Sequence, residues 1–251
     1  MSIHENFSEG DFANSTQVRL PICFCLDTSG SMNAPTRSGR TRMDEVNAAF
    51  SAFINSIKAM PAVNSAADIA IISFGGKPAI EQKFTPISAM MTPRIEVRTR
   101  SLTPIGEAIL VALKMIELRK AGYKSRGIRY YQPWLVVITD GEPEGKEAVA
   151  HMEEAIKQTN ALESQNKLVV FNIGIGDEND AAALNLDTLR RLSVKRPAPI
   201  NLQVENISSF FELLGMSSAS VVAGNDADDI LYGKGSDLPQ GEKLDFSEWK
   251  T

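Results

Sequence analysis

The sequence predicts an α/β protein whose sheet is mostly parallel. Short apolar runs of strand length are continuous rather than alternating, which is typical of strands that helices cover on both faces. Segments with apolar residues at helical spacing separate most of these runs, as parallel connections require. One pair of runs is joined directly by Gly75-Gly76, and the alternation of Ile80, Gln82 and Phe84 after it predicts a hairpin with an exposed edge strand.

Strands and helices are expected to alternate along the chain. The expected strands cover residues 22–26, 68–74, 80–84, 134–139, 168–173 and 200–204. Apolar residues at helical spacing predict helices over residues 43–57, 105–116, 148–159, 186–192 and 207–214. Thr41 and Asp44 are placed to cap the first helix, and Pro61 follows its expected end. The core is expected to end at about Gly215.

The first strand is followed by a group of oxygen-bearing side chains. Asp27 comes directly after the run 22–26, so its carboxylate is expected at the carboxyl end of a central strand, where open α/β sheets bind ligands. Gly30 permits a tight turn that brings the hydroxyls of Ser29 and Ser31 back toward Asp27. One carboxylate and two hydroxyls are hard ligands that suit Mg²⁺ or Mn²⁺, although such clusters are also common in turns.

Two further positions offer oxygen atoms to the same edge. Asp140 follows the strand 134–139 and is itself followed by a glycine. Thr103 precedes Pro104 and the start of a helix, where it is either an N-cap or a ligand. Two strand ends and one helix start are therefore predicted to bring hard oxygen atoms to one region. The residues that carry these atoms are Asp27, Ser29, Ser31, Thr103 and Asp140.

This pattern resembles the von Willebrand factor A family, whose metal-ion-dependent adhesion site is Asp-x-Ser-x-Ser with a distant Thr and a distant Asp. The resemblance extends over about residues 18–215 and includes the order of the elements. It implies a Rossmann-like, doubly wound, mostly parallel six-stranded sheet with one antiparallel edge strand and helices on both faces.

The resemblance also implies a ligand set for a divalent cation. Asp27, Ser29, Ser31 and Thr103 would be ligands, and Asp140 would act directly or through water. Mg²⁺ is the expected metal, with Mn²⁺ and Ca²⁺ as alternatives. Many bacterial members place a glycine pair just before the Thr, where this chain has Ser101-Leu102.

Three segments are most similar to the small bacterial TerY-type proteins of the family, which are associated with tellurite resistance and stress. These segments are residues 19–21, 43–47 and 103–109. Genes of that group tend to lie beside genes for a PP2C-type phosphatase and a Ser/Thr kinase, so the similarity implies such proteins as partners.

We expect a metal-dependent protein-interaction module rather than an enzyme. Two carboxylates do not satisfy a divalent cation, and an acidic side chain of another protein is the natural missing ligand. The two histidines, His4 and His151, both lie away from the expected strand ends, so no histidine base is available to the serines.

Two other interpretations stay open. The first is a Mg²⁺-dependent hydrolase or phosphatase that uses Asp27 and Asp140, since two carboxylates and a metal can activate water. The second is a nucleotide-binding loop at Gly174-Ile175-Gly176, which lacks the third glycine of the dinucleotide pattern.

Charge is distributed unevenly along the 251 residues, whose formal net charge is −5. From Met216 onward there are three lysines and seven acidic residues, which are Asp226, Asp228, Asp229, Asp237, Glu242, Asp245 and Glu248. The nearly neutral remainder gives no electrostatic reason to expect nucleic-acid binding. We therefore divide the chain into a flexible N-terminal segment, 1–17, a domain, 18–215, and an acidic tail, 216–251.

A basic and aromatic loop precedes the strand 134–139. It contains Arg119, Lys120, Lys124, Arg126 and Arg129, interleaved with Tyr123, Tyr130 and Tyr131. Such a loop can bind phosphates or an acidic partner, but it is more often simply solvated. Because it follows a helix and precedes a strand, we expect it at the end of the sheet opposite Asp27.

The sequence suggests a cytoplasmic location without a membrane anchor. Residues 1–17 are polar, and no uninterrupted apolar stretch is long enough to span a bilayer. Cys23 and Cys25 lie two positions apart in the first strand, where a disulfide between them would be strained. We expect both to be small core residues in a reducing compartment.

Overall fold

The computed structural model describes residues 17–98, 103–141, 146–176, 187–196, 200–203 and 207–224. Their strands form one sheet in the order β3-β2-β1-β4-β5-β6. The strands are β1 (Leu20–Asp27), β2 (Ala67–Phe74), β3 (Ala79–Pro86), β4 (Trp134–Thr139), β5 (Val169–Gly176) and β6 (Ile200–Gln203). Every neighbouring pair is parallel except β2 and β3, which are antiparallel, so the predicted mixed α/β sheet with an antiparallel pair is confirmed.

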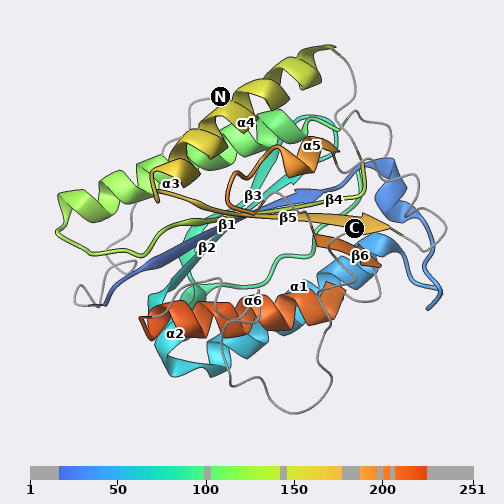
Figure 1. The fold of residues 1–251 in the computed structure, drawn as a ribbon. Coiled ribbons are helices and arrows are strands. Elements are labelled where there is room, and N and C mark those ends of the chain that lie inside the picture. Colours follow the sequence, from blue (N-terminus) through green and yellow to red (C-terminus); the bar gives the residue numbers. More distant parts are fainter. Residues whose placement is uncertain are drawn as a thin grey trace.

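Helices cover both faces of the sheet (Figure 1). On one face lie α1 (Arg42–Ala59), α2 (Pro61–Ala66) and α6 (Ile207–Val222). On the other lie α3 (Ile105–Ser125), α4 (Lys146–Ser164) and the short α5 (Asp187–Arg190). Two 3₁₀ turns, η2 (Gly30–Asn33) and η3 (Ile87–Ala89), lie in the connections.

Strand β1 contributes to both layers of the core because successive side chains of a strand point to opposite faces. Leu20, Ile22, Phe24 and Leu26 belong to the cluster under α1 and α6, where the rings of Phe24 and Phe50 meet edge to face with their centroids 5.0 Å apart. Cys23 and Cys25 belong to the cluster under α3 and α4, where both are buried core residues, as expected.

Helix α6 continues past the expected end of the core at about Gly215. Its residues Ser217, Ser218 and Val221 are buried, and the helix ends at Val222. The two serines lack the apolar character by which the sequence marks a buried face, which is why the prediction placed the end of the core too early. Gly215 packs against α1: an added Cβ would lie 3.5 Å from the side chain of Ile57, which is an ordinary van der Waals contact.

The start of α1 is capped as predicted. The hydroxyl of Thr41 accepts a hydrogen bond from the Asp44 amide at 3.1 Å, and the Asp44 carboxylate returns to the Thr41 amide at 3.4 Å. This capping box fixes where the helix begins. It therefore also fixes the position of Arg42, the first residue of the helix.

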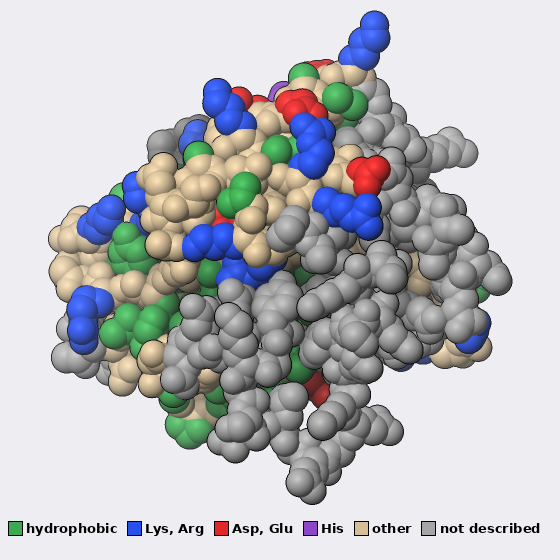
Figure 2. Space-filling model, viewed as in Figure 1, with side chains coloured by type: hydrophobic (Ala, Val, Ile, Leu, Met, Phe, Trp, Pro, Cys, Tyr) green, Lys and Arg blue, Asp and Glu red, His purple; other side chains and the backbone are tan. Residues whose placement is uncertain are grey.

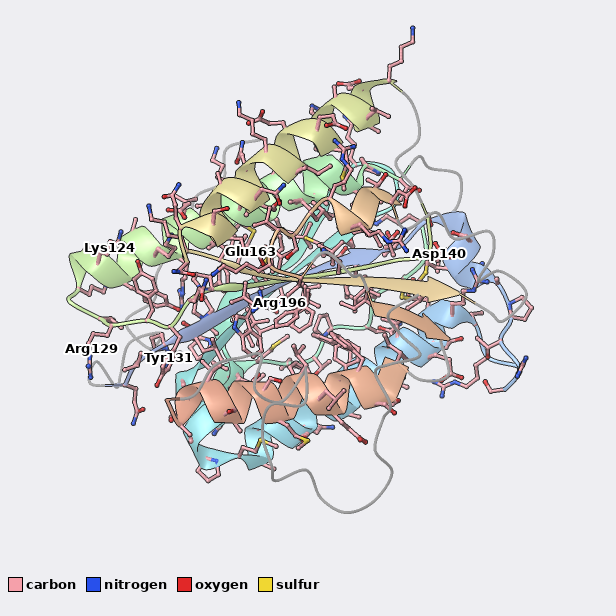
Figure 3. The ribbon with its side chains drawn as sticks, in the orientation of Figure 1. Lys124, Arg129, Tyr131, Asp140, Glu163 and Arg196 are labelled. Atoms are coloured by element: carbon pink, nitrogen blue, oxygen red, sulfur yellow. The ribbon has the colours of Figure 1, made fainter. Side chains whose placement is uncertain are left out.

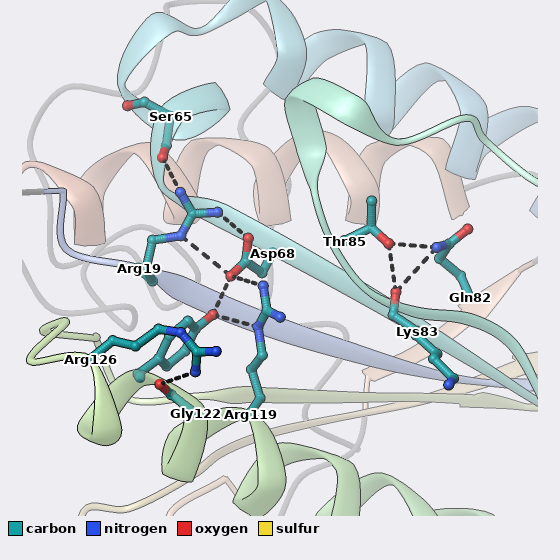
Figure 4. Close-up of polar contacts among 10 residues, drawn as sticks. Arg19, Ser65, Asp68, Gln82, Lys83, Thr85, Arg119, Gly122 and Arg126 are labelled. Carbon is teal, nitrogen blue, oxygen red and sulfur yellow. Dashed lines mark hydrogen bonds and ion pairs between the residues drawn. The ribbon is translucent and has the colours of Figure 1, made fainter. Parts of the chain in front are cut away.

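An ion network that the sequence did not reveal is buried at the amino end of β2 (Figure 4). Asp68 accepts hydrogen bonds from the guanidinium groups of Arg19 and Arg119 and from the hydroxyl of Tyr123, all of them buried. The Arg19 side chain also donates to the carbonyl of Ser65 at 2.7 Å. The network joins β1, β2 and α3 at the edge of the sheet opposite Asp27.

Strands β1 and β4 are neighbours at the centre of the sheet, with Leu26 in register with Ile138. The chain leaves β1 toward β2 on one side and leaves β4 toward β5 on the other. The carboxyl ends of β1 and β4 therefore form the switch point at which open α/β sheets bind ligands. Asp27 is the last residue of β1, and Asp140 is the first residue after β4.

Candidate metal site

Asp27 is held rigidly at the end of β1. Its carboxylate is buried, and Oδ1 accepts a hydrogen bond from the amide of Ser29 at 2.8 Å. Oδ2 accepts one from the hydroxyl of Thr139, the last residue of β4, at 2.5 Å. One carboxylate oxygen is therefore oriented by the turn between β1 and η2, and the other by the end of β4.

A chain of hydroxyls connects the two strand ends. The Oγ atoms of Ser29 and Ser31 lie 2.9 Å apart, and Ser31 Oγ donates to Asp140 Oδ1 at 2.8 Å. Asp140 lies at the end of the sheet where the β arrows point in Figure 3. Four of the five predicted residues, Asp27, Ser29, Ser31 and Asp140, are thus linked by hydrogen bonds.

Backbone hydrogen bonds to Thr28 hold the turn that carries Ser29 and Ser31. The amide of Thr28 donates to the carbonyl of Phe74 at 2.7 Å, and the carbonyl of Thr28 accepts from the Arg98 amide at 2.8 Å. A Cβ added to Gly75 would lie 2.5 Å from the Thr28 backbone, so only glycine permits this close approach. At Gly30 an added Cβ would meet nothing within 4 Å, and the 3₁₀ turn η2 rather than a glycine conformation bends the chain.

Thr103 is buried two residues before α3, but it does not cap that helix. Pro104 occupies the N-cap position and has no side-chain hydrogen bond, while the Thr103 carbonyl accepts from the Ile105 amide at 2.9 Å. The N-cap alternative is therefore wrong. Within the residues that the structure describes, no hydrogen bond joins Thr103 to the other four predicted site residues, and its role as a ligand stays a prediction.

Burial and charge both act on Asp27. Desolvation raises the pKa of its carboxyl group from 3.8 to about 6, and the nearby Asp140 carboxylate contributes in the same direction. The hydrogen bonds from Thr139 and Ser29 oppose this shift without cancelling it. A buried carboxylate next to a second one is a site that a cation would stabilise.

Arg42 is a site residue that the sequence analysis missed. Its Nη1 atom donates to Asp140 Oδ2 at 3.0 Å, and 7% of its side chain is exposed. One signal was available, since Arg42 stands one helical turn before Val46 on the apolar stripe of α1. It also occupies the first turn of a helix, where acidic residues are favoured over basic ones.

Thr139 was also missed. Its hydroxyl donates to Asp27 and accepts a hydrogen bond from the amide of Gly141 at 3.1 Å, so it orients both strand ends. The sequence shows only a threonine at the end of an apolar run. Its role depends on β1 and β4 being neighbours, which the order of residues does not state.

The donor set matches a hard divalent cation. Carboxylate and hydroxyl oxygens suit Mg²⁺, Mn²⁺ or Ca²⁺ and do not suit a soft metal. Nowhere in the described part of the chain do three or more His, Cys, Asp or Glu side chains cluster in a way that could hold a metal ion. The hydroxyls of Ser29 and Ser31 would therefore have to complete any site built on Asp27 and Asp140.

The fold is shared with solved structures of low sequence identity. BatB from Bacteroides thetaiotaomicron is 18% identical, with a TM-score of 0.52 over 81% of this chain and 98% of that one. The vWF domain of the type V pili tip protein Mfa5 from Porphyromonas gingivalis is 11% identical, with a TM-score of 0.57 over 92% and 100%. The pilus adhesin SpaC from Lactobacillus rhamnosus GG is 12% identical, with a TM-score of 0.61 over 82% and 31%.

No curated relative matches the chain. Of the helices that the structure describes, none combines the length and the apolar character needed to cross a membrane. The family model of the von Willebrand factor type A domain matches residues 22–193, from the first strand to the segment after α5. The match includes the turn after β1 and the end of β4, and the chain belongs to the von Willebrand factor type A domain family.

Proposed function

We propose that the chain is a metal-dependent protein-interaction module in which a divalent cation, Mg²⁺ first, binds at the carboxyl ends of β1 and β4. Domains of this family are commonly interaction modules. The observation that carries the proposal is the hydrogen-bonded set of Asp27, Ser29, Ser31 and Asp140, in which two carboxylates meet beside neutral hydroxyls. Thr103 is the proposed fifth ligand.

The charges of the site favour an acidic partner. Asp27 and Asp140 carry two negative charges when ionised, and Arg42 supplies one positive charge. A bound divalent cation would change the sum from −1 to +1, because Arg42 has already balanced one carboxylate. A carboxylate of another protein would neutralise this remaining charge and fill a coordination position that the hydroxyls leave to water.

We assign the module to a cytoplasmic stress or tellurite-resistance system of the TerY type. The proposal rests on the similarity of residues 19–21, 43–47 and 103–109 to that group. A PP2C-type phosphatase and a Ser/Thr kinase are the proposed partners.

Hydrolysis is the less favoured function. The hydrogen-bonded groups at the two strand ends are carboxylates, hydroxyls and one guanidinium, and that guanidinium is already paired with Asp140 rather than placed to hold a transferring phosphoryl group. Turnover of a phosphate ester by the purified chain, lost in Asp27→Ala, would favour the hydrolase over the module.

Two experiments test the proposal: the first measures metal binding, and the second measures capture of the partner. Isothermal titration should give a single Mg²⁺ site in the wild-type chain and none in Asp27→Ala, while Glu154→Ala, an exposed carboxylate on α4, should leave binding unchanged. Capture of the phosphatase or kinase should then require Mg²⁺ and fail both with EDTA and in Asp27→Ala. Capture that survives EDTA would contradict the proposal.

A further inference from the structure

The end of the sheet at which the parallel strands begin carries a surface that is separate from the candidate metal site. Five exposed basic residues lie in the last turn of α3, in the loops before β4 and β5, and after α5. We call them the basic pole: Lys124, Arg126, Arg129, Lys167 and Lys195. In Figure 3, Lys124 and Arg129 lie at the end of the molecule opposite Asp140. The expected position is confirmed, but α3 runs to Ser125, so Arg119, Lys120 and Lys124 belong to the helix and not to the predicted loop.

Hydrogen bonds hold the three loops of the basic pole together. The carbonyl of Arg129 accepts from the amide of Arg19, and the carbonyl of Pro133 accepts from the amide of Val169, just after Lys167. The ammonium group of Lys195 donates to the side chain of Asn166. The segments that carry the basic residues before β4, before β5 and after α5 are therefore neighbours at this end of the sheet.

The acidic residues beneath this surface are buried and already paired. Asp68 is matched by two guanidinium groups, those of Arg19 and Arg119, and Glu163 is matched by Arg196. Neither Lys124 nor Arg129 forms an ion pair with a carboxylate of the described residues. On the face shown in Figure 2, Lys and Arg side chains are visible where α3 ends, and no Asp or Glu side chain is visible beside them. The pole therefore projects a positive potential.

The last described helix ends at this pole. The hydroxyl of Tyr131, which follows Arg129 by two residues, donates to the carbonyl of Val222 at 3.1 Å. The described chain then stops at Gly224. Residues 225–251 carry seven acidic residues and three lysines, so a segment of charge −4 follows a helix that ends beside the basic pole.

We propose that residues 225–251 bind the basic pole of the same chain. Tethering at Gly224 gives the segment an effective concentration of the order of 1 mM at the pole, so even a weak attraction fills the surface. The attraction is electrostatic and is screened by salt, since the Debye length falls from about 10 Å at 0.1 M to about 3 Å at 1 M. Bound in this way, the tail shields the pole from other polyanions, independently of the metal site.

The test measures how fast lysines of the full-length chain are acetylated by a dilute amine reagent, read by mass spectrometry. Two full-length variants bracket the wild type. In one, all seven acidic residues of 225–251 are changed to Asn or Gln; in the other, Lys234, Lys243 and Lys250 are changed to Gln, which takes the segment to a charge of −7. Lys114, exposed on α3 about 15 Å before Lys124 along the helix, is the internal control.

We expect Lys124, Lys167 and Lys195 to react about threefold faster in the variant without acidic residues, whose segment has a charge of +3, than in the wild type. They should react more slowly in the variant of charge −7. Lys114 should react equally in all three proteins, and 1 M NaCl should abolish the differences. Equal reactivity of the pole lysines in all three proteins would overturn the proposal. Protection that disappears on dilution would overturn the proposal in favour of a tail from a second copy. Protection that persists in the variant without acidic residues would overturn it in favour of an external polyanion.

Discussion

A carboxylate is buried at each end of the parallel strands, which we call the amino edge and the carboxyl edge of the sheet. The groups around the two carboxylates differ. At the amino edge, Asp68 is surrounded by two guanidinium groups and a tyrosine hydroxyl. At the carboxyl edge, Asp27 is surrounded by hydroxyls, one amide and a second carboxylate, that of Asp140. Both aspartates are almost fully buried, so exposure does not distinguish them.

Counter-charge distinguishes the two edges. Asp68 with Arg19 and Arg119 sums to +1, whereas Asp27 and Asp140 with Arg42 sum to −1 when both carboxylates are ionised. Folding supplies the cations of the first group from the chain itself, which makes that group structural. The second group has one guanidinium for two carboxylates, and a divalent cation would supply the missing positive charge. Four substitutions test the comparison.

The largest effect is expected at the amino edge. Asp68→Asn leaves two buried guanidinium groups without their carboxylate, which should lower the free energy of unfolding by about 3–5 kcal/mol. The measurement is urea denaturation. Glu153→Ala, which breaks an exposed pair with Arg191, is the matched control and should lower the free energy of unfolding far less, because water screens exposed ion pairs. A similar small cost for Asp68→Asn would remove the distinction between the two edges.

At the carboxyl edge the corresponding substitution, Asp27→Asn, should raise the free energy of unfolding at neutral pH, whereas Asp68→Asn lowers it. The pKa of Asp27 is about 6 in the folded chain, against 3.8 for an unperturbed aspartate, so the folded state binds more protons between these values. Its stability therefore falls as pH rises from about 4 to 6, by up to about 3 kcal/mol without metal. Asp27→Asn should lose this pH dependence.

Thermal unfolding at pH 4 and pH 7, with and without Mg²⁺, measures the effect. Mg²⁺ should stabilise the wild-type chain at pH 7, by about 2.7 kcal/mol when its concentration is 100 times the dissociation constant, and should not stabilise Asp27→Asn. A wild-type chain that is as stable without metal at pH 7 as at pH 4, relative to Asp27→Asn, would show that Asp27 is not electrostatically strained.

Substitutions of two glycines test whether contact with Gly75 holds the turn that follows Asp27. An added Cβ at Gly75 would lie 2.5 Å from the Thr28 backbone, whereas one at Gly141 would meet nothing within 4 Å. Gly75→Ala should therefore cost about 1–3 kcal/mol and weaken Mg²⁺ binding by displacing the turn that follows Asp27. Gly141→Ala should change both little. Equal metal affinity in the two variants would mean that the turn is not held through Gly75.

The smallest effect is expected at Arg42. Arg42→Gln removes a positive charge that competes with the metal for Asp140, so the affinity for Mg²⁺ should rise about fivefold, or about 1 kcal/mol. Affinity for an acidic partner in the presence of Mg²⁺ should fall, because the loaded site becomes neutral. Arg94→Gln, which breaks an exposed pair with Asp44, is the control for isothermal titration. Parallel changes in both affinities would indicate a merely structural role for Arg42.

The sequence went far toward the fold because its signals are local. Continuous apolar runs predicted buried strands, and β4 matched its expected range of 134–139. Capping residues fixed the start of α1, and Gly75-Gly76 fixed the hairpin of β2 and β3. These features depend on residues within a few positions of one another, so they can be recognised without knowing the tertiary structure.

What the sequence determined by itself, then, is which residue types stand at the ends of the strands, including Asp27 and Asp140. Only the tertiary structure decided their partners: Thr139 for Asp27, Arg42 for Asp140, and the arginines and tyrosine for Asp68. These partners are 49 to 112 positions apart. Whether such residues meet depends on which strands are neighbours and how each helix is rotated on the sheet, and periodicity carries neither piece of information.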